Sequence, residues 1–123
     1  MSLIGEVSRT AVVFDVSGIH EDGWCEPLVT FKVGVNSDVS LCQLAIWLMR
    51  EPDRQHSHFS VRFGSSKSFE FDLLHERTSC VQIACPSISG GVIEAALHCD
   101  NLVSDKGQDL RPLSFKINSV AFA

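Results

Sequence analysis

Apolar and polar residues alternate one by one along most of the chain, and this alternation constrains the fold more than any other feature. The clearest run, LVTFKVG, places Val29, Phe31 and Val33 on one face and Thr30 and Lys32 on the other. Because successive side chains of a β-strand point to opposite faces, such a run predicts a strand with one buried face. No window of helical length carries the i, i+3, i+4, i+7 spacing of an amphipathic helix. The alternation therefore predicts an all-β protein.

Eight runs of this kind are separated by turn-rich pieces, and they cover residues 10–16, 28–34, 39–48, 59–64, 68–74, 80–85, 92–99 and 113–122. The run at 39–48 is apolar on both faces, as is typical of a central strand, with a short helix as the alternative. In the last run the alternation slips after Ile117, which predicts a β-bulge near Asn118 and Ser119. The segment FSVRFGSSKSFEF predicts a hairpin. We predict a two-sheet antiparallel β-sandwich, jelly-roll-like, of about eight strands, with a closed barrel as the alternative.

Length and charge limit the organisation and the partners. A chain of 123 residues fits one domain, so we treat residues 1–123 as a single β-sandwich domain, which could be cut from a larger protein with residues 1–3 as an added leader. The formal net charge is -5 and the ten Lys and Arg residues are scattered, so nucleic acid is not expected as a partner. No apolar run approaches the roughly 20 residues that cross a bilayer. We expect a cytoplasmic protein without a transmembrane segment.

The five cysteines predict neither a disulfide framework nor a metal site. Their number is odd and no C-x-x-C spacing occurs. Four lie in strand-like runs, where a free cysteine behaves as a small buried apolar residue. His56 and His58 would share one side of a strand, a spacing that β-sheet metal sites use, but no third ligand accompanies them. We therefore expect no metal and no cofactor.

Catalytic motifs are missing from the sequence. It contains no G-x-S-x-G, no glycine-rich phosphate loop, no H-E-x-x-H and no serine beside an obvious base. The adjacent acids Glu21 and Asp22 do not suit the separation of about 5 to 9 Å that glycosidases use. Asp100, Asp105 and Asp109 surround a loop that could bind Ca²⁺, but their spacing matches no known loop signature. We expect no catalytic residues.

Tryptophan is the residue type to consider for carbohydrate, because its flat face stacks on a pyranose ring. Trp24 lies in a turn and is the freer of the two, whereas Trp47 lies in the apolar run and is expected in the core. The chain has no tyrosine, which argues against a broad aromatic platform.

The order of short motifs resembles a β-sandwich accessory domain associated with bacterial glycosyltransferases of cell-surface polysaccharide biosynthesis. The pattern consists of an acidic-Gly-Trp turn, an L-x-I-x-W-L strand in which the Trp of this chain is displaced by about one residue, a hairpin and an acid-x-Arg turn. The matching positions are Gly18, His20, Asp22, Gly23, Trp24, Pro27, Phe31, Leu44, Ile46, Trp47, Leu48, the segment VRFGSSKSFEFDL, Asp109, Arg111 and Leu113. The pattern usually has Tyr or Phe where this chain has His20, and Pro112 interrupts the last motif.

The resemblance implies a noncatalytic module that contacts glycan or a neighbouring catalytic domain, with the catalysis in another domain. Its binding residues would be Trp24, Asp22, His20, Asp109 and Arg111. Since both turns belong to the pattern, Arg111 is also the natural partner for the first loop's carboxylate, so the same residues could form a structural clasp. The alternatives are an oligomerisation module, such as a homodimer, and a small sugar-active enzyme.

Overall fold

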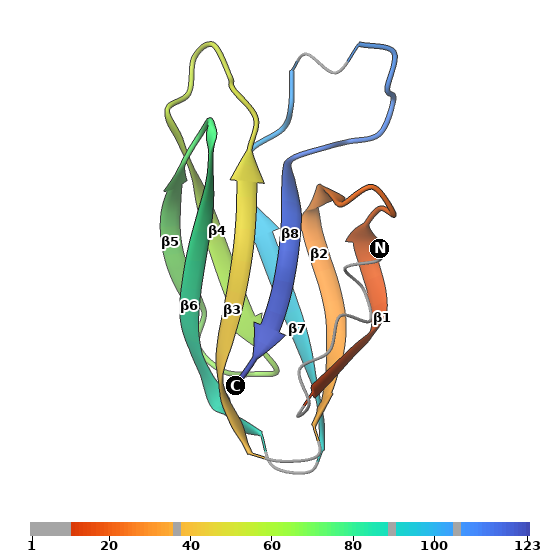
Figure 1. Cartoon of the computed structure of the whole chain (residues 1–123), viewed down its shortest axis with the longest axis vertical. Coiled ribbons are helices and arrows are strands. Elements are labelled where there is room, and N and C mark those ends of the chain that lie inside the picture. Colours follow the sequence, from red (N-terminus) through yellow and green to blue (C-terminus); the bar gives the residue numbers. More distant parts are fainter. Residues whose placement is uncertain (1–10, 36–37, 89–90, 105–106) are drawn as a thin grey trace.

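A computed structural model describes residues 11–35, 38–88, 91–104 and 107–123, and within them the chain forms eight β-strands and no helix (Figure 1). The strands are β1 (Ala11–Ile19), β2 (Trp24–Val35), β3 (Val39–Leu48), β4 (His56–Phe63), β5 (Phe69–Leu74), β6 (Arg77–Ile88), β7 (Val92–Cys99) and β8 (Phe115–Phe122). The prediction of an all-β protein is confirmed. These residues include no helix able to cross a membrane, and the predicted cytoplasmic location stays a prediction.

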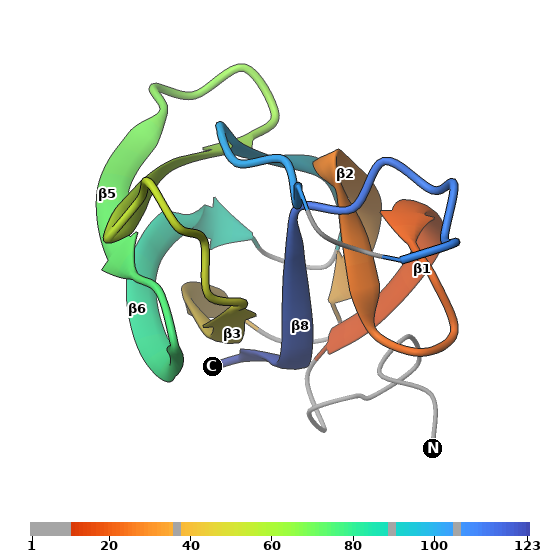
Figure 2. The same cartoon turned by 90° about the horizontal axis from the view of Figure 1, so that it is seen from above.

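The strands form one antiparallel sheet that nearly closes on itself. Its order is β5-β4-β7-β2-β8-β3-β6, with β1 paired to β2. The start of β2 pairs with β8 and its later part with β7, so this strand links the two halves of the sheet. Seen from above, the strands curve around a common axis (Figure 2). Because all eight strands join in one curved sheet, the predicted division into two jelly-roll sheets is not confirmed.

Most of the core consists of residues that the alternation assigned to the buried face. Val29 and Val33 are fully buried and Phe31 is 4% exposed, while Thr30 and Lys32 on the other face are half-buried. In the centre, the ring of Phe59 lies 5.2 Å from that of Phe115 in an edge contact and 5.4 Å from that of Phe71 in a stacked contact. Aromatic pairs at these separations stabilise a core beyond the area they bury.

Several local predictions are confirmed. The run at 39–48 forms β3, a central strand between β6 and β8. The register between β3 and β8 passes from Ala45–Ser119 to Ile46–Ile117, so Asn118 is the extra residue of the expected bulge. β4 and β5 form the expected hairpin.

The cysteines only partly match their prediction. Cys25, Cys42, Cys85 and Cys99 are free and buried, and burial raises the pKa of the Cys25 and Cys42 thiols to about 12. Cys80, in contrast, is exposed although it lies in a strand-like run. It pairs with Ala45 on the outer face of the sheet, so the alternation, and not the local apolar composition, decides its exposure.

Candidate binding site at the Trp24 turn

The stretch between β1 and β2 is a tight hairpin turn. The backbone N–H of Gly23 donates to His20 O (2.9 Å), and that of His20 donates to Trp24 O (2.8 Å). Gly23 has a φ of 87°, a conformation that glycine adopts without the strain of a side chain. The Asp22 carboxylate accepts from the Trp24 N–H at 3.2 Å, closing the turn in the manner of an Asx-turn. These bonds fix the direction in which Asp22 and Trp24 leave the turn.

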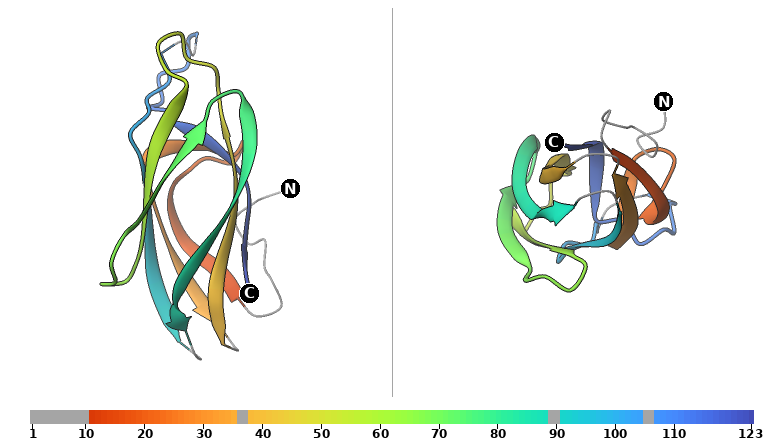
Figure 3. Two further views of the ribbon diagram at one scale, coloured as in Figure 1. Left: turned by 90° about the vertical axis from the view of Figure 1, so that its left-hand side faces the viewer. Right: turned by 90° about the horizontal axis from the view of Figure 1, so that it is seen from below.

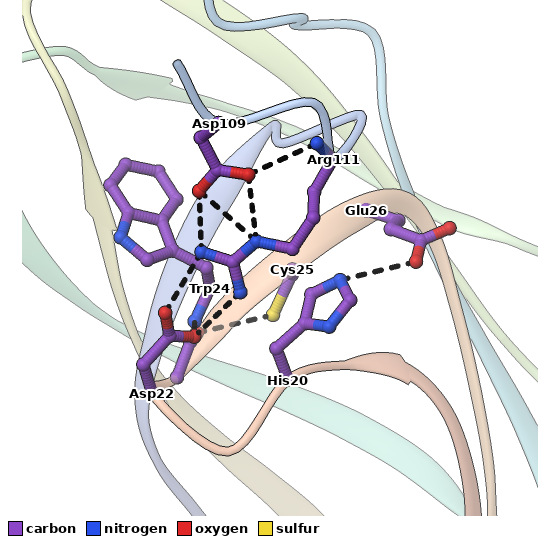
Figure 4. A network of polar contacts seen from close by, with 8 residues as sticks. His20, Asp22, Trp24, Cys25, Glu26, Asp109 and Arg111 are labelled. Carbon is purple, nitrogen blue, oxygen red and sulfur yellow. Dashed lines mark hydrogen bonds and ion pairs between the residues drawn. The ribbon is translucent and has the colours of Figure 1, made fainter. Parts of the chain in front are cut away.

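Arg111 joins this turn to a distant loop. Its Nη1 and Nη2 donate to the two carboxylate oxygens of Asp22 at 3.3 and 2.9 Å. Its Nε donates to both oxygens of Asp109 at 2.9 and 3.1 Å, and its Nη2 to Asp109 Oδ2 at 2.6 Å (Figure 4). The predicted contact between Arg111 and a carboxylate of the first loop is therefore confirmed. We call Asp22, Asp109 and Arg111 the loop clasp.

The charges of the loop clasp stabilise one another. The hydrogen bond from Arg111 is the main cause that holds the pKa of Asp22 below its ordinary value, against the raising effect of desolvation. The two carboxylates, Asp109 first, raise the pKa of Arg111 above its ordinary range. Since Nε, Nη1 and Nη2 all donate within the clasp, this guanidinium is committed to holding the loops together.

Trp24 meets Trp47 on the outer face beside the loop clasp. Their ring centroids lie 5.8 Å apart at an interplanar angle of 70°. Lys116 of β8 pairs with Trp24 on one side and Trp47 on the other, so the three residues form a row across β2, β8 and β3. Both tryptophans are half-buried. The expectation that Trp47 lies in the core is wrong, because it belongs to the outer face of β3.

His20 does not join the loop clasp. Its Nε2 is buried and lies 3.2 Å from Glu26 Oε2, an ion-pair distance without a hydrogen bond. Glu21 is exposed, and Asp22 is engaged by Arg111 and the Trp24 N–H. The structure thus brings four of the predicted site residues together, Trp24, Asp22, Asp109 and Arg111, and places His20 against Glu26.

Ser57 and His75 form a buried pair that was not predicted from the sequence. Ser57 Oγ lies 2.7 Å from His75 Nε2, and His75 Nδ1 lies 2.6 Å from the carbonyl oxygen of Met49. Because that carbonyl can only accept, Nδ1 carries the proton and Nε2 accepts from the Ser57 hydroxyl when the ring is neutral. Ser57 is 1% exposed and His75 is 7% exposed, and Arg54 also donates to Ser57 Oγ at 3.3 Å. The pair is closed to substrate as it stands, and it satisfies two buried polar groups.

His58 binds two carboxylates on the outer face of the β4–β5 hairpin. Its Nδ1 lies 2.8 Å from Asp72 Oδ1 and its Nε2 lies 2.9 Å from Glu70 Oε1. We call these three residues the strand clamp. Both ring nitrogens face carboxylate oxygens, and His56 does not take part. The described part of the chain holds no His, Cys, Asp or Glu cluster that could bind a metal ion.

The aspartates considered for Ca²⁺ are engaged with arginines. Asp100 binds Arg54 through both carboxylate oxygens at 3.1 and 3.3 Å, and Asp109 binds Arg111. Asp105 lies outside the described residues.

The chain matches no protein-family profile, and neither the curated proteins nor the solved structures contain a match to it.

Proposed function

We propose that the chain is a noncatalytic binding module that contacts a saccharide through Trp24 and Trp47. The observation that carries the proposal is the Trp24–Trp47 pair, two half-buried indoles in contact on the outer face of the sheet beside the loop clasp. Aromatic rings supply apolar contact area at low conformational cost, and the neighbouring polar groups fix a ligand's orientation. The resemblance to glycosyltransferase-associated accessory domains supports the same function.

Two charged groups border the pair, namely the loop clasp on one side and Lys116 between the two tryptophans. Arg111 is occupied by two carboxylates, so it cannot bind an acidic sugar without opening the loop clasp. The side chain of Asp22 is 48% exposed and has lone pairs that can accept from sugar hydroxyls. In this proposal Arg111 and Asp109 position Asp22, and the tryptophans make the apolar contact.

Glycan-array binding followed by calorimetry tests the proposal. We expect Trp24→Ala and Trp47→Ala each to weaken binding about tenfold or more, the range for losing an aromatic anchor. Phe14→Ala is the matched control, since Phe14 is an exposed aromatic residue on β1 and 38% exposed. Equal binding by all three variants, or no binding by the wild-type chain to any glycan, would contradict the proposal.

A second candidate is self-association through the outer face of β1, β2 and β7. Val12, Phe14 and Val92 are exposed there, and a Cβ placed on Gly34 would lie 3.5 Å from the Phe14 ring and 3.9 Å from Val92 Cγ2. These side chains thus meet over one glycine and form an apolar patch of the kind that dimers bury. Sedimentation at several concentrations tests it, with Phe14→Lys expected to abolish any dimer.

A further inference from the structure

The two end strands of the sheet face each other without pairing. β5 pairs only with β4 and β6 only with β3 in the described part of the chain, although a two-residue turn, His75–Glu76, joins β5 to β6. The left view of Figure 3 faces this side of the molecule. We call the space between Phe69–Leu74 and the facing part of β6 the seam. It presents two rows of unpaired backbone N–H and C=O groups.

The core is open at the seam. Phe69, Phe71 and Leu73 pair in register with Val61, Phe59 and Ser57, so all six side chains lie on the inner face. The three residues of β4 are at most 3% exposed, whereas Phe71 and Leu73 are half-buried and Phe69 is 42% exposed. Inner-face residues of an edge strand remain exposed when no further strand covers them.

A groove of about 570 Å³ lies at the end of the seam away from the turn. It is lined by Ser66, Lys67, Ser68, Phe69 and Glu70 on one side and by Ala84 and Cys85 of β6 on the other. A volume of this size lies within the range of pockets that hold ligands. The groove is therefore bounded on one side by the β4–β5 turn and the start of β5, with Phe69 as its large apolar side chain, and on the other side by β6.

We propose that the seam receives an extended segment of a partner protein, which adds a short strand between β5 and β6 where they diverge, away from the His75–Glu76 turn (Figure 3). A segment lying between two edges must pair on both of its sides. The edge strand of a second folded copy has only one free side and cannot enter, which leaves an extended, unpaired segment as the occupant. Apolar side chains at alternate positions of that segment would cover Phe69, Phe71 and Cys85.

Lys67 at the rim of the groove favours an acidic residue in the partner. Lys67 is exposed, and no ion pair to it occurs among the described residues. The nearby Glu70 carboxylate is engaged by His58 at 2.9 Å. Lys67 is therefore the cationic side chain among the residues that line the groove, and a carboxylate of the partner can pair with it.

The other free edge of the sheet is less suited to this role. β1 shows register shifts on both sides of Ser17, and Asp15 has a φ of 55°. Bulges of this kind break the regular row of backbone groups and protect an edge from pairing. The pairing of β5 with β4 shows no register shift among the described residues. The pairing of β6 with β3 shows one, between Val39 and Leu41, where β3 pairs with the end of β6.

The test is an NMR titration of the full chain with a short acetylated peptide that alternates threonine and valine and carries a glutamate at each end. We expect shift changes confined to the amides of Phe69–Leu74 and of residues 79–85. A peptide with a central proline, which lacks one backbone donor, should bind about tenfold more weakly, and so should a peptide with terminal lysines. Lys67→Glu should reverse the preference between the glutamate and lysine peptides, while the control Arg62→Glu on β4 should keep it.

Three results would overturn the proposal. The first is that the glutamate peptide shows no saturable binding, or that the proline peptide binds as tightly as the glutamate peptide. The second is a shift pattern on β5 and β6 that depends on protein concentration without peptide, which would assign the seam to a second copy. The third is peptide binding only after removal of residues 1–10, which would assign the seam to the chain's own N-terminal segment.

Discussion

The loop clasp and the strand clamp place one cation between two carboxylates, but they do so with different cations. In the loop clasp, Arg111 bridges Asp22 and Asp109, which lie in two separate loops. In the strand clamp, His58 of β4 bridges Glu70 and Asp72 of β5, whose strands already pair along their length. Arginine keeps its charge at every accessible pH, whereas histidine gains or loses it near neutrality.

The difference predicts opposite responses to pH. A neutral imidazole has one N–H and can donate to only one of the two carboxylates, so the strand clamp is complete only when His58 is protonated. The loop clasp depends instead on ionised aspartates. The loop clasp should weaken in acid and the strand clamp should weaken in base.

The largest effect should come from the packing below the strand clamp. Phe59 is fully buried against Phe71 and Phe115, so Phe59→Ala should cost about 3–5 kcal/mol of unfolding free energy. Urea denaturation measures it, with Leu102→Ala, at a residue that is 57% exposed, as the control expected within about 0.5 kcal/mol of wild type. A small loss in the core variant would mean that polar contacts, and not packing, hold β4 and β5.

Charge reversal at Arg111 should have the next largest effect. Arg111→Glu places three carboxylates together and removes the bonds between the two loops. We expect a melting temperature lower by several degrees and a changed tryptophan fluorescence, because Trp24 leaves the same turn. Arg62→Glu on β4 is the control. Unchanged melting of the Arg111 variant would show that the loop clasp has no structural role.

The acid response of the loop clasp should be smaller. Because the folded-state pKa of Asp22 is lowered, its contribution to stability is present above the unfolded value of about 3.8 and is lost as pH falls through the folded value. The difference in melting temperature between wild type and Asp22→Asn should therefore shrink as pH falls below about 4. A difference that stays constant through this window would assign the effect to something other than ionisation.

The strand clamp should give the smallest stability effect but a clear titration. Hydrogen bonds from His58 to Glu70 and then Asp72 raise its pKa above the ordinary 6.5. The contribution of the strand clamp to folding stability is complete below about pH 6.5, the ordinary pKa of histidine, and is lost as the pH rises through the pKa of His58 in the folded protein. NMR of the imidazole should show the raised pKa, lowered in Glu70→Gln and Asp72→Asn but not in Glu94→Gln. Equal His58 pKa values in all variants would contradict the clamp.

Most of the fold could be predicted from the sequence because alternation reports directly on which face of a strand is buried. The bulge at Asn118, the hairpin of β4 and β5 and the central position of β3 all follow from that pattern. The closure of the sheet could not be predicted, since it depends on β2 pairing with β7 along one part and with β8 along another. Local alternation contains no information about such a change of partner.

The candidate site, like the fold, could be predicted only in part from the sequence. A contact between Arg111 and a carboxylate of the first loop was predicted from two short motifs, and in the structure that carboxylate belongs to Asp22. The outer-face position of Trp47 was missed because its run is apolar on both faces. The contact between Ser57 and His75 was missed because it depends on the register between strands. Once Ser57 is known to pair with Leu73, His75 lies close to it by necessity, but the sequence alone does not give that register.

The most direct test of the proposed function uses the two indole N–H signals, one for each tryptophan of the chain. A glycan identified on the array is titrated into the ¹⁵N-labelled protein. If the pair is the binding surface, the signals of Trp24 and Trp47 shift together and saturate at one dissociation constant. Saturable binding that leaves both indole signals unmoved would contradict the account.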